Sequence, residues 1–179
     1  MGICISCVNY GDEELKLLEQ NIGNKLSSSI KIEENILLSA IKEFRELKAN
    51  NEFDCNVSIT AEIIEATYYY KQYNKLNNKL KKIRKDHEAI KNTKSYYRPK
   101  YSEHFEGNGL EILCGMKSEG KKLIEDLENI NTEYEEMQYN KQNTITEKEM
   151  ENMRSFLSNS LSKNNEVSDS KLVRLLLLY

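Results

Sequence analysis

The sequence has little of the chemistry that makes turns, since its 179 residues include only 7 glycines and 1 proline. It has no tryptophan, and 31% of its residues are charged against 39% that are hydrophobic. A fold of many strands needs frequent turns, which glycine and proline mostly supply. This shortage disfavours a β or α/β fold and, with abundant lysine, glutamate, leucine and isoleucine, favours a mostly helical chain.

The sequence also lacks a long hydrophobic run. No stretch reaches the roughly 18 apolar residues that a membrane-spanning helix needs, and there is no secretory h-region. We therefore expect a protein of the cytoplasmic compartment. There Cys55 and Cys114 would stay reduced and pack as small apolar side chains.

Common catalytic and metal-binding patterns are missing as well. The sequence has no Walker-type G-x-x-x-x-G-K, no H-E-x-x-H, no G-x-S-x-G and no calcium loop. Of its two histidines, His87 falls on an expected helix seam, which favours a packed structural role, and His104 lacks the Cys or Asp cluster that a metal needs. We expect no enzymatic activity, no cofactor and no metal site.

The first functional pattern that is present lies at the N-terminus, which reads Met1-Gly2-Ile3-Cys4-Ile5-Ser6-Cys7. Gly2 followed by a serine four positions later matches both required positions for N-myristoylation. One myristoyl chain binds a membrane only marginally, and the acidic residues 12–14 would be repelled by an anionic leaflet. Palmitate on Cys4 and Cys7 is therefore the expected second signal. We interpret residues 1–11 as an acylated segment that holds the chain on a membrane.

Two long segments show apolar residues at three- and four-residue steps. Residues 12–49 predict one amphipathic helix, with a seven-residue gap in its apolar seam and weak points at Gly23 and residues 27–29. A second helix is predicted from about residue 58 to residue 94, after a turn at residues 50–54. The two seams predict an antiparallel hairpin over about residues 12–94. The second seam is Ile59, Ile63, Ala66, Tyr70, Tyr73, Leu76, Leu80, Ile83, His87 and Ile90.

Shorter helices are expected after the hairpin, over about residues 110–158, because Pro99 and the glycines that follow it break the chain. Thr146, with Glu149 three residues on, is a capping-box signature for one of these helices. Residues 12–161 thus form one helical domain, and residues 162–179 form a polar linker and a terminal leucine-rich helix. The predicted fold is all-α, a long antiparallel helical hairpin followed by shorter C-terminal helices.

Charge is segregated along the chain, because residues 71–100 carry 11 bases against 2 acids, whereas the flanking regions are mainly acidic. Interleaved tyrosines would suit nucleic acid, but anionic lipid is the nearer polyanion for a lipidated chain, so nucleic acid is not the expected partner. The plainer alternative is a solvated face that pairs with acidic helices of this chain or of a neighbour. The candidate lipid- or partner-binding residues are Lys79, Lys81, Lys82, Arg84 and Lys85.

The terminal helix is too short to be stable alone, so it must dock. It packs either on the core of this chain or in the groove of a partner helical bundle. The candidate residues for docking to a partner are Leu172, Arg174, Leu175 and Leu178.

Several segments carry a family resemblance, namely Gly109–Leu113, Met116–Leu123, Met153–Leu161 and Asp169–Leu172. With Gly2 and the long hairpin, they resemble the ESCRT-III family, the charged multivesicular body proteins, in its N-myristoylated branch. The chain differs from that family in its acidic first helix and in having Lys171 where the partner-binding motif has leucine.

The resemblance implies membrane remodelling and endosomal sorting, assembly with copies of itself or with related helical subunits, and no cofactor. It also implies that Arg174-Leu175-x-x-Leu178 recruits an AAA ATPase through the helical-bundle adaptor domain of that enzyme.

The leading hypothesis is a non-enzymatic helical assembly protein, anchored by lipid to the cytoplasmic face of an endosomal or plasma membrane. The alternative is a lipidated structural or scaffold coiled-coil protein at the plasma or ciliary membrane. A hairpin with arms of roughly equal length favours the assembly protein, whereas one continuous rod or a compact bundle favours the scaffold.

Overall fold

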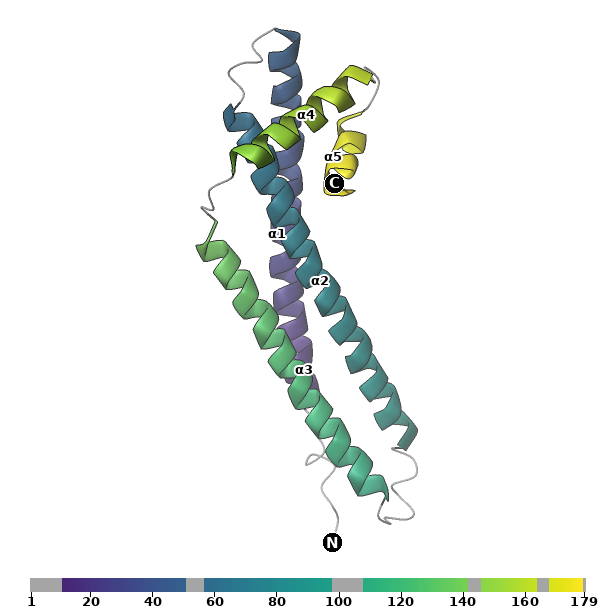
Figure 1. The fold of residues 1–179 in the computed structure, drawn as a ribbon. Helices are drawn as coiled ribbons and strands as arrows, with labels where there is room; N and C mark the ends of the chain where they lie inside the picture. The colour runs from purple at the N-terminus through teal and green to yellow at the C-terminus, as the bar shows by residue number, and fades with distance from the viewer. Residues whose placement is uncertain (1–10, 51–56, 98–107, 142–145, 164–167, 179) are drawn as a thin grey trace. The chain divides into compact units, whose positions relative to one another are not determined.

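The computed structural model describes residues 11–50, 57–97, 108–141, 146–163 and 168–178, and the regular structure within these ranges is entirely helical. Helices α1 (Asp12–Ala49) and α2 (Val57–Tyr97) pack against each other as a hairpin, and α3 (Asn108–Tyr139), α4 (Glu147–Lys163) and α5 (Asp169–Leu178) follow (Figure 1). The predicted all-α fold, with a long hairpin before shorter helices, is confirmed.

The helices run somewhat past their predicted ends, since α2 was predicted to end at about residue 94 and α4 extends to Lys163, beyond the predicted end at about residue 158. Helix α2 ends at Tyr97, two residues before Pro99, as expected because proline disfavours the helical conformation in the residue that precedes it. Helix α1 continues through Gly23 and the serines at residues 27–29 without a break. The predicted turn at residues 50–54 lies mostly outside the described residues.

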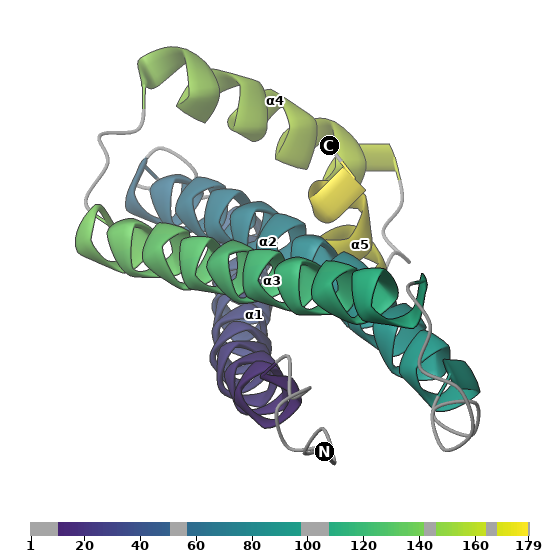
Figure 2. The ribbon, with the colours of Figure 1, turned by 90° about the horizontal axis from the view of Figure 1, so that it is seen from below.

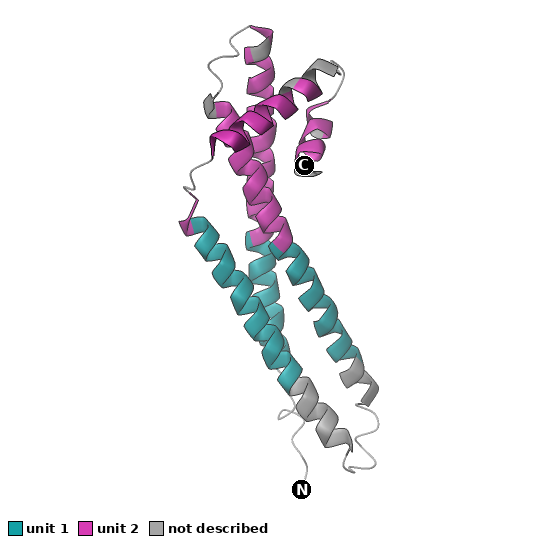
Figure 3. Cartoon of the chain, in the orientation of Figure 1, with its two compact units in different colours: residues 1–25, 76–138 teal, residues 26–75, 139–179 magenta. Residues whose placement is uncertain are grey.

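Two compact units divide the chain (Figure 3). Unit 1 comprises residues 1–25 and 76–138, and unit 2 comprises residues 26–75 and 139–179. Because α1 and α2 run antiparallel, the first part of α1 meets the last part of α2 in unit 1, and their remaining parts meet in unit 2. The compact units are therefore assembled from segments that are distant in sequence.

Unit 1 is built from three helical segments, which belong to α1, α2 and α3. Helices α1 and α2 come close at Gly23, where a Cβ atom would lie 2.6 Å from Nη2 of Arg84. Full burial of one large apolar side chain stabilises the fold by about 1.5–3 kcal/mol relative to leaving it exposed. The buried apolar residues of this unit are Leu15, Ile22, Leu76, Leu80, Ile83, Ile90, Leu123, Leu127 and Ile130.

Unit 2 has a core to which four helices contribute, and Figure 2 shows α5 folded back beside α4. Its buried cluster consists of Leu37, Ala40, Ile41, Phe44, Ile59, Ile63, Ala66, Met153, Leu157, Leu172, Val173 and Leu176. The terminal leucine-rich helix therefore packs intramolecularly. An ion pair between Nε of Arg45 and Oδ1 of Asp169, 2.9 Å apart, joins the first turn of α5 to α1.

The buried positions of unit 2 differ from the predicted apolar seams at several places, two of which have partners distant in sequence. Tyr69 is buried and Tyr70 is partly exposed, the reverse of the predicted seam. The ring of Tyr69 lies 6.1 Å from that of Tyr73, and its hydroxyl donates to the carbonyl of Asn140 at 3.2 Å. The seven-residue gap in the seam of α1 contains Glu33, which is 2% exposed and whose Oε1 lies 2.9 Å from Nζ of Lys141. Partners distant in sequence decided both positions.

Candidate functional site

The residues of the predicted acylation pattern, Gly2, Cys4 and Cys7, lie outside the described part of the chain. The first described residue is Gly11, whose φ of 82° is the left-handed conformation that glycine adopts without strain. The carbonyl of Gly11 accepts the first hydrogen bond of α1, from the N–H of Leu15 at 2.8 Å. A Cβ at Gly11 would lie 3.2 Å from Cδ1 of Ile124, so the start of α1 lies against α3 in unit 1.

The five predicted basic residues divide into two groups in unit 1. Two of them make contacts inside the unit: Nζ of Lys79 lies 3.1 Å from Oε2 of Glu133 on α3, and Nη2 of Arg84 donates to the carbonyl of Glu19 on α1 at 3.3 Å. These two residues therefore help to hold the three helices of the unit together. Lys79 therefore fits the plainer alternative given above, in which the basic residues pair with acidic helices of the same chain.

The other three residues, Lys81, Lys82 and Lys85, are exposed and make no ion pair with another described residue. Their spacing places Lys81 and Lys85 on the side of α2 opposite the buried Leu80 and Ile83, with Lys82 at the edge of that side that borders the groove to α3. They are therefore the part of the predicted basic set that is available to bind an external anionic surface.

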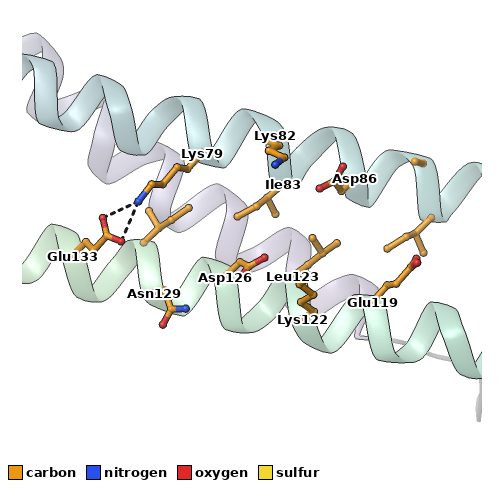
Figure 4. A pocket seen from close by; sticks show the side chains of 13 residues that line it. Lys79, Lys82, Ile83, Asp86, Glu119, Lys122, Leu123, Asp126, Asn129 and Glu133 are labelled. Atoms are coloured by element: carbon orange, nitrogen blue, oxygen red, sulfur yellow. Dashed lines mark hydrogen bonds and ion pairs between the residues drawn. The ribbon is translucent and has the colours of Figure 1, made fainter.

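A groove with a volume of about 660 Å³ lies between α2 and α3 in unit 1 (Figure 4). Its apolar lining is Ile83, Ala89, Ile90, Leu123 and Ile130. Its charged lining is Lys79, Lys82 and Asp86 from α2, and Glu119, Lys122, Asp126 and Glu133 from α3. The ion pair between Lys79 and Glu133 bridges the two helices, as the dashed lines in Figure 4 show.

His87 is the one histidine within the described residues, and it is 3% exposed in unit 1. Its Nδ1 lies 2.7 Å from Oε1 of Glu19, and its Nε2 lies 2.6 Å from Oδ1 of Asp12, both on α1. An ionised carboxylate only accepts hydrogen bonds, so a ring N–H of His87 donates to it, and the tautomer of the ring sets which nitrogen is the donor. Nζ of Lys91 lies 3.6 Å from the same Asp12 oxygen.

The packed position of His87 was predicted, but its partners were missed. Asp12 and Glu19 are seven residues apart, so they lie on one face of α1, and that spacing was the available signal. The sequence analysis instead considered the acidic residues 12–14 only as charges that an anionic leaflet would repel. Among the described residues, no group of three or more histidine, cysteine, aspartate or glutamate side chains is arranged to hold a metal ion.

The candidate docking residues of α5, which belongs to unit 2, differ in whether their side chains are buried or exposed. Leu172 is fully buried in the core, whereas Leu175 is 40% exposed and Arg174 is exposed. The side chain of Leu178 is not among those described. A partner that binds Leu172 would therefore have to displace α5 from the core, while Arg174 and Leu175 are accessible in place.

A smaller pocket in unit 2 lies beside Glu33 and Lys141, with Glu62 and Glu65 also in its lining. Nζ of Lys141 is 5.5 Å from the ring centroid of Tyr69, within range for a cation–π contact. Burial, followed by the negative charge of Glu65, raises the pKa of the Tyr69 hydroxyl above its usual value of 10.0. These contacts join the residues that follow α3 to the hairpin, and the lysine neutralises a carboxylate that would otherwise be buried alone.

Comparison of the chain with known proteins finds no matching family model, no matching curated protein and no matching solved structure. Within the part of the chain that the structure describes, no helix is both long and apolar enough to cross a membrane. Fold and surfaces together define an all-helical protein with a long hairpin, a segregated charge distribution and a docked C-terminal helix.

Proposed function

We propose that the chain is a non-enzymatic helical assembly protein, held on the cytoplasmic face of an endosomal or plasma membrane by fatty acids on Gly2, Cys4 and Cys7. In this proposal it assembles with copies of itself or with related helical subunits and acts in membrane remodelling, as an ESCRT-III-like subunit. The observation that carries the proposal is the acylation pattern directly before a long helical hairpin.

The anchor part of the proposal follows from the shortage of other membrane signals near the N-terminus. Residues 12–14 are acidic, and Asp12 is engaged with His87 and Lys91, so this region offers no basic patch. A single myristoyl chain gives only reversible binding, which leaves palmitate on the two nearby cysteines as the second signal.

Localisation of the wild type beside Gly2→Ala and Cys4→Ser/Cys7→Ser variants tests the anchor. An alkyne analogue of myristate reports the first acyl chain, and release by neutral hydroxylamine reports thioester-linked palmitate. We expect Gly2→Ala to lose both labels and the membrane fraction, and the cysteine variant to keep myristate but lose stable membrane residence. If only Gly2→Ala leaves the membrane, dual acylation is wrong and myristoylation stands.

The assembly part is supported by the arms of the hairpin, since α1 has 38 residues and α2 has 41. Roughly equal arms were the feature expected of the assembly protein rather than of a rod-like scaffold. Full-length protein on anionic vesicles, viewed by negative-stain electron microscopy, should form filaments or recruit a related subunit. Protein that stays monomeric on such vesicles would contradict the proposal.

Recruitment of an AAA ATPase through Arg174, Leu175 and Leu178 belongs to the same proposal. Among the docking residues of α5 with described side chains, Leu172 is buried in unit 2, whereas Arg174 and Leu175 of the motif are exposed. An isolated α5 peptide should therefore bind a helical-bundle adaptor domain more tightly than the full chain does. Equal binding would show that the packing of α5 does not limit recruitment.

A second candidate function, a lipidated scaffold that receives a partner helix, is favoured by the groove between α2 and α3, with its apolar floor and charged rim. The two candidates differ in what happens without a partner. The assembly protein polymerises alone, whereas the scaffold stays monomeric until the partner is added.

A further inference from the structure

We propose that unit 1 binds unit 1 of a second copy of the chain, with the exposed lysine face of α2 against an acidic face of α3 on the neighbour. The lysine face is Lys81, Lys82 and Lys85, and the acidic face is Glu125, Glu128 and Glu136. This inference rests on the proposed self-assembly and names the contact that would produce it.

The lysine face is free of acids. It lies opposite the buried side of α2, with Lys82 at the edge that borders the groove, and its three lysines are exposed. The helical spacing places Asp86 and Glu88 at its two edges rather than within it. The face therefore presents uncompensated positive charge to whatever approaches α2 from outside the unit.

The acidic face of α3 is equally uniform, because no lysine or arginine occurs between Leu123 and Asn140. Glu125, Glu128 and Glu136 are exposed and lie opposite the buried Leu127 and Ile130. They form no ion pair with another described residue. Lys121 precedes this face by one turn and is the nearest base on the same side of α3.

The two faces do not neutralise each other inside one molecule: Lys81 and Lys85 lie on the outer side of α2, and Lys82, which lines the groove beside Lys79, makes no ion pair with a described residue of α3. The single ion pair between the described parts of α2 and α3 joins Lys79 and Glu133, which lie at the groove between the helices. Lys79 and Glu133 are thus already partnered, whereas both outer faces are available to another molecule.

A second copy satisfies both faces at once. An anionic membrane would attract the lysines of α2 but repel the acids of α3 in the same unit. Because the two surfaces differ, their contact is heterologous, and a chain of such contacts either closes into a ring or extends as an open filament. Charge complementarity between exposed faces also predicts association that weakens with salt.

Two charge-reversal variants of the full chain test the contact. The first carries Lys81→Glu, Lys82→Glu and Lys85→Glu, and the second carries Glu125→Lys, Glu128→Lys and Glu136→Lys. A matched control, Lys16→Glu/Lys42→Glu/Lys148→Glu, changes three other exposed lysines and gives the same net charge as the first variant. Far-UV circular dichroism checks that each variant keeps its helix content.

Sedimentation velocity at about 50 mM and about 500 mM salt measures self-association, since screening is much stronger at the higher concentration. We expect wild type and control to associate at low salt, and each reversal variant to associate on the order of tenfold more weakly or worse. Mixing the two reversal variants should restore assembly, because each then offers the charge that the other lacks.

Three outcomes would overturn the inference. If both reversal variants assemble like the wild type, the contact is wrong and the proposed self-assembly stands. If the wild type remains monomeric in both salts and on vesicles, self-assembly itself is wrong. If the first variant loses flotation with phosphatidylserine vesicles but keeps self-association, the lysine face binds lipid rather than a second copy.

Discussion

Nδ1 of His87 on α2 lies 2.7 Å from Oε1 of Glu19 on α1, and both side chains are largely buried in unit 1. The pair joins the two hairpin arms in this unit, and Nε2 of the same ring lies 2.6 Å from Oδ1 of Asp12 on α1. A buried polar contact of this kind adds little net stability over apolar packing, but loss of one partner is destabilising.

Replacement of His87 by alanine should lower the free energy of unfolding by about 3 kcal/mol, because it leaves the carboxylate of Glu19 buried without its partner. Urea unfolding followed by circular dichroism measures the change. Lys16→Ala, at an exposed position of α1 in the same unit, is the control and should change stability by less than about 0.5 kcal/mol. The double variant with Glu19→Gln should lose less than the sum of the single losses; strict additivity would show that the two side chains are not coupled.

Gly23→Ala should have two opposing effects. Alanine favours a helix interior over glycine by about 1 kcal/mol, but its Cβ would meet the end of the Arg84 side chain at 2.6 Å. Arg84 can move aside, at the loss of its bond to Glu19. We therefore expect Gly23→Ala to be nearly neutral in the wild type and stabilising in an Arg84→Ala background. Thermal unfolding of the wild type and the three variants measures this, and equal effects in the two backgrounds would contradict the close approach.

The predicted capping box of α4 is present: the N–H of Thr146 donates to Oε2 of Glu149 at 3.0 Å, and the N–H of Glu149 donates to Oγ1 of Thr146 at 3.3 Å. Thr146→Ala should cost about 1 kcal/mol of local helix stability. Hydrogen exchange of the α4 amides reports this loss, and Glu151→Gln, elsewhere on the exposed surface of α4, is the control. Unchanged protection in Thr146→Ala would show that packing alone holds the helix start.

The same cap should depend on pH. Hydrogen bonds from the backbone and then the side chain of Thr146 lower the pKa of Glu149 below its usual 4.5. A lowered folded-state pKa means that stabilisation is present above the unfolded value and is lost as the pH falls through the folded value. The difference in α4 exchange between wild type and Glu149→Gln should be present at neutral pH and vanish in acid. A difference that persists at the lowest pH would contradict this.

Truncation of two leucines of α5 should destabilise the protein to very different extents. Leu172→Ala creates a cavity in the core of unit 2 and should cost about 2–5 kcal/mol. Leu175→Ala, on the exposed side of the same helix, should change stability by less than about 0.5 kcal/mol. Chemical denaturation of both variants measures the contrast, and similar losses would mean that α5 is not docked as described.

Structural features were predicted correctly from the sequence where all the residues that determine them lie close together along the chain. The end of α2 before Pro99 and the reciprocal bonds of Thr146 and Glu149 depend on residues within one turn of each other. The hairpin followed from apolar periodicity, which records the buried face of a helix without naming its partner. The acylation pattern stays a prediction, because Gly2, Cys4 and Cys7 lie outside the described residues.

Partners distant in sequence could not be predicted in this way. Glu33 is buried in the gap of the α1 seam because Lys141, which follows α3, forms an ion pair with it. The five basic residues of α2 differ in their contacts because Lys79 pairs with a carboxylate on α3 and Arg84 donates to a carbonyl on α1. No periodicity within one helix reports such contacts.

The sequence by itself determined that the chain is helical, roughly where its helices begin and end, and most of the residues on the apolar faces, since these depend on spacing along one chain. Only the tertiary structure decided that α5 packs on its own core, that His87 lies between two carboxylates, and that Lys81, Lys82 and Lys85 remain free. These outcomes depend on which helix faces meet in three dimensions. Each is set by the burial of side chains and by the pairing of polar groups that lie tens of residues apart in the sequence.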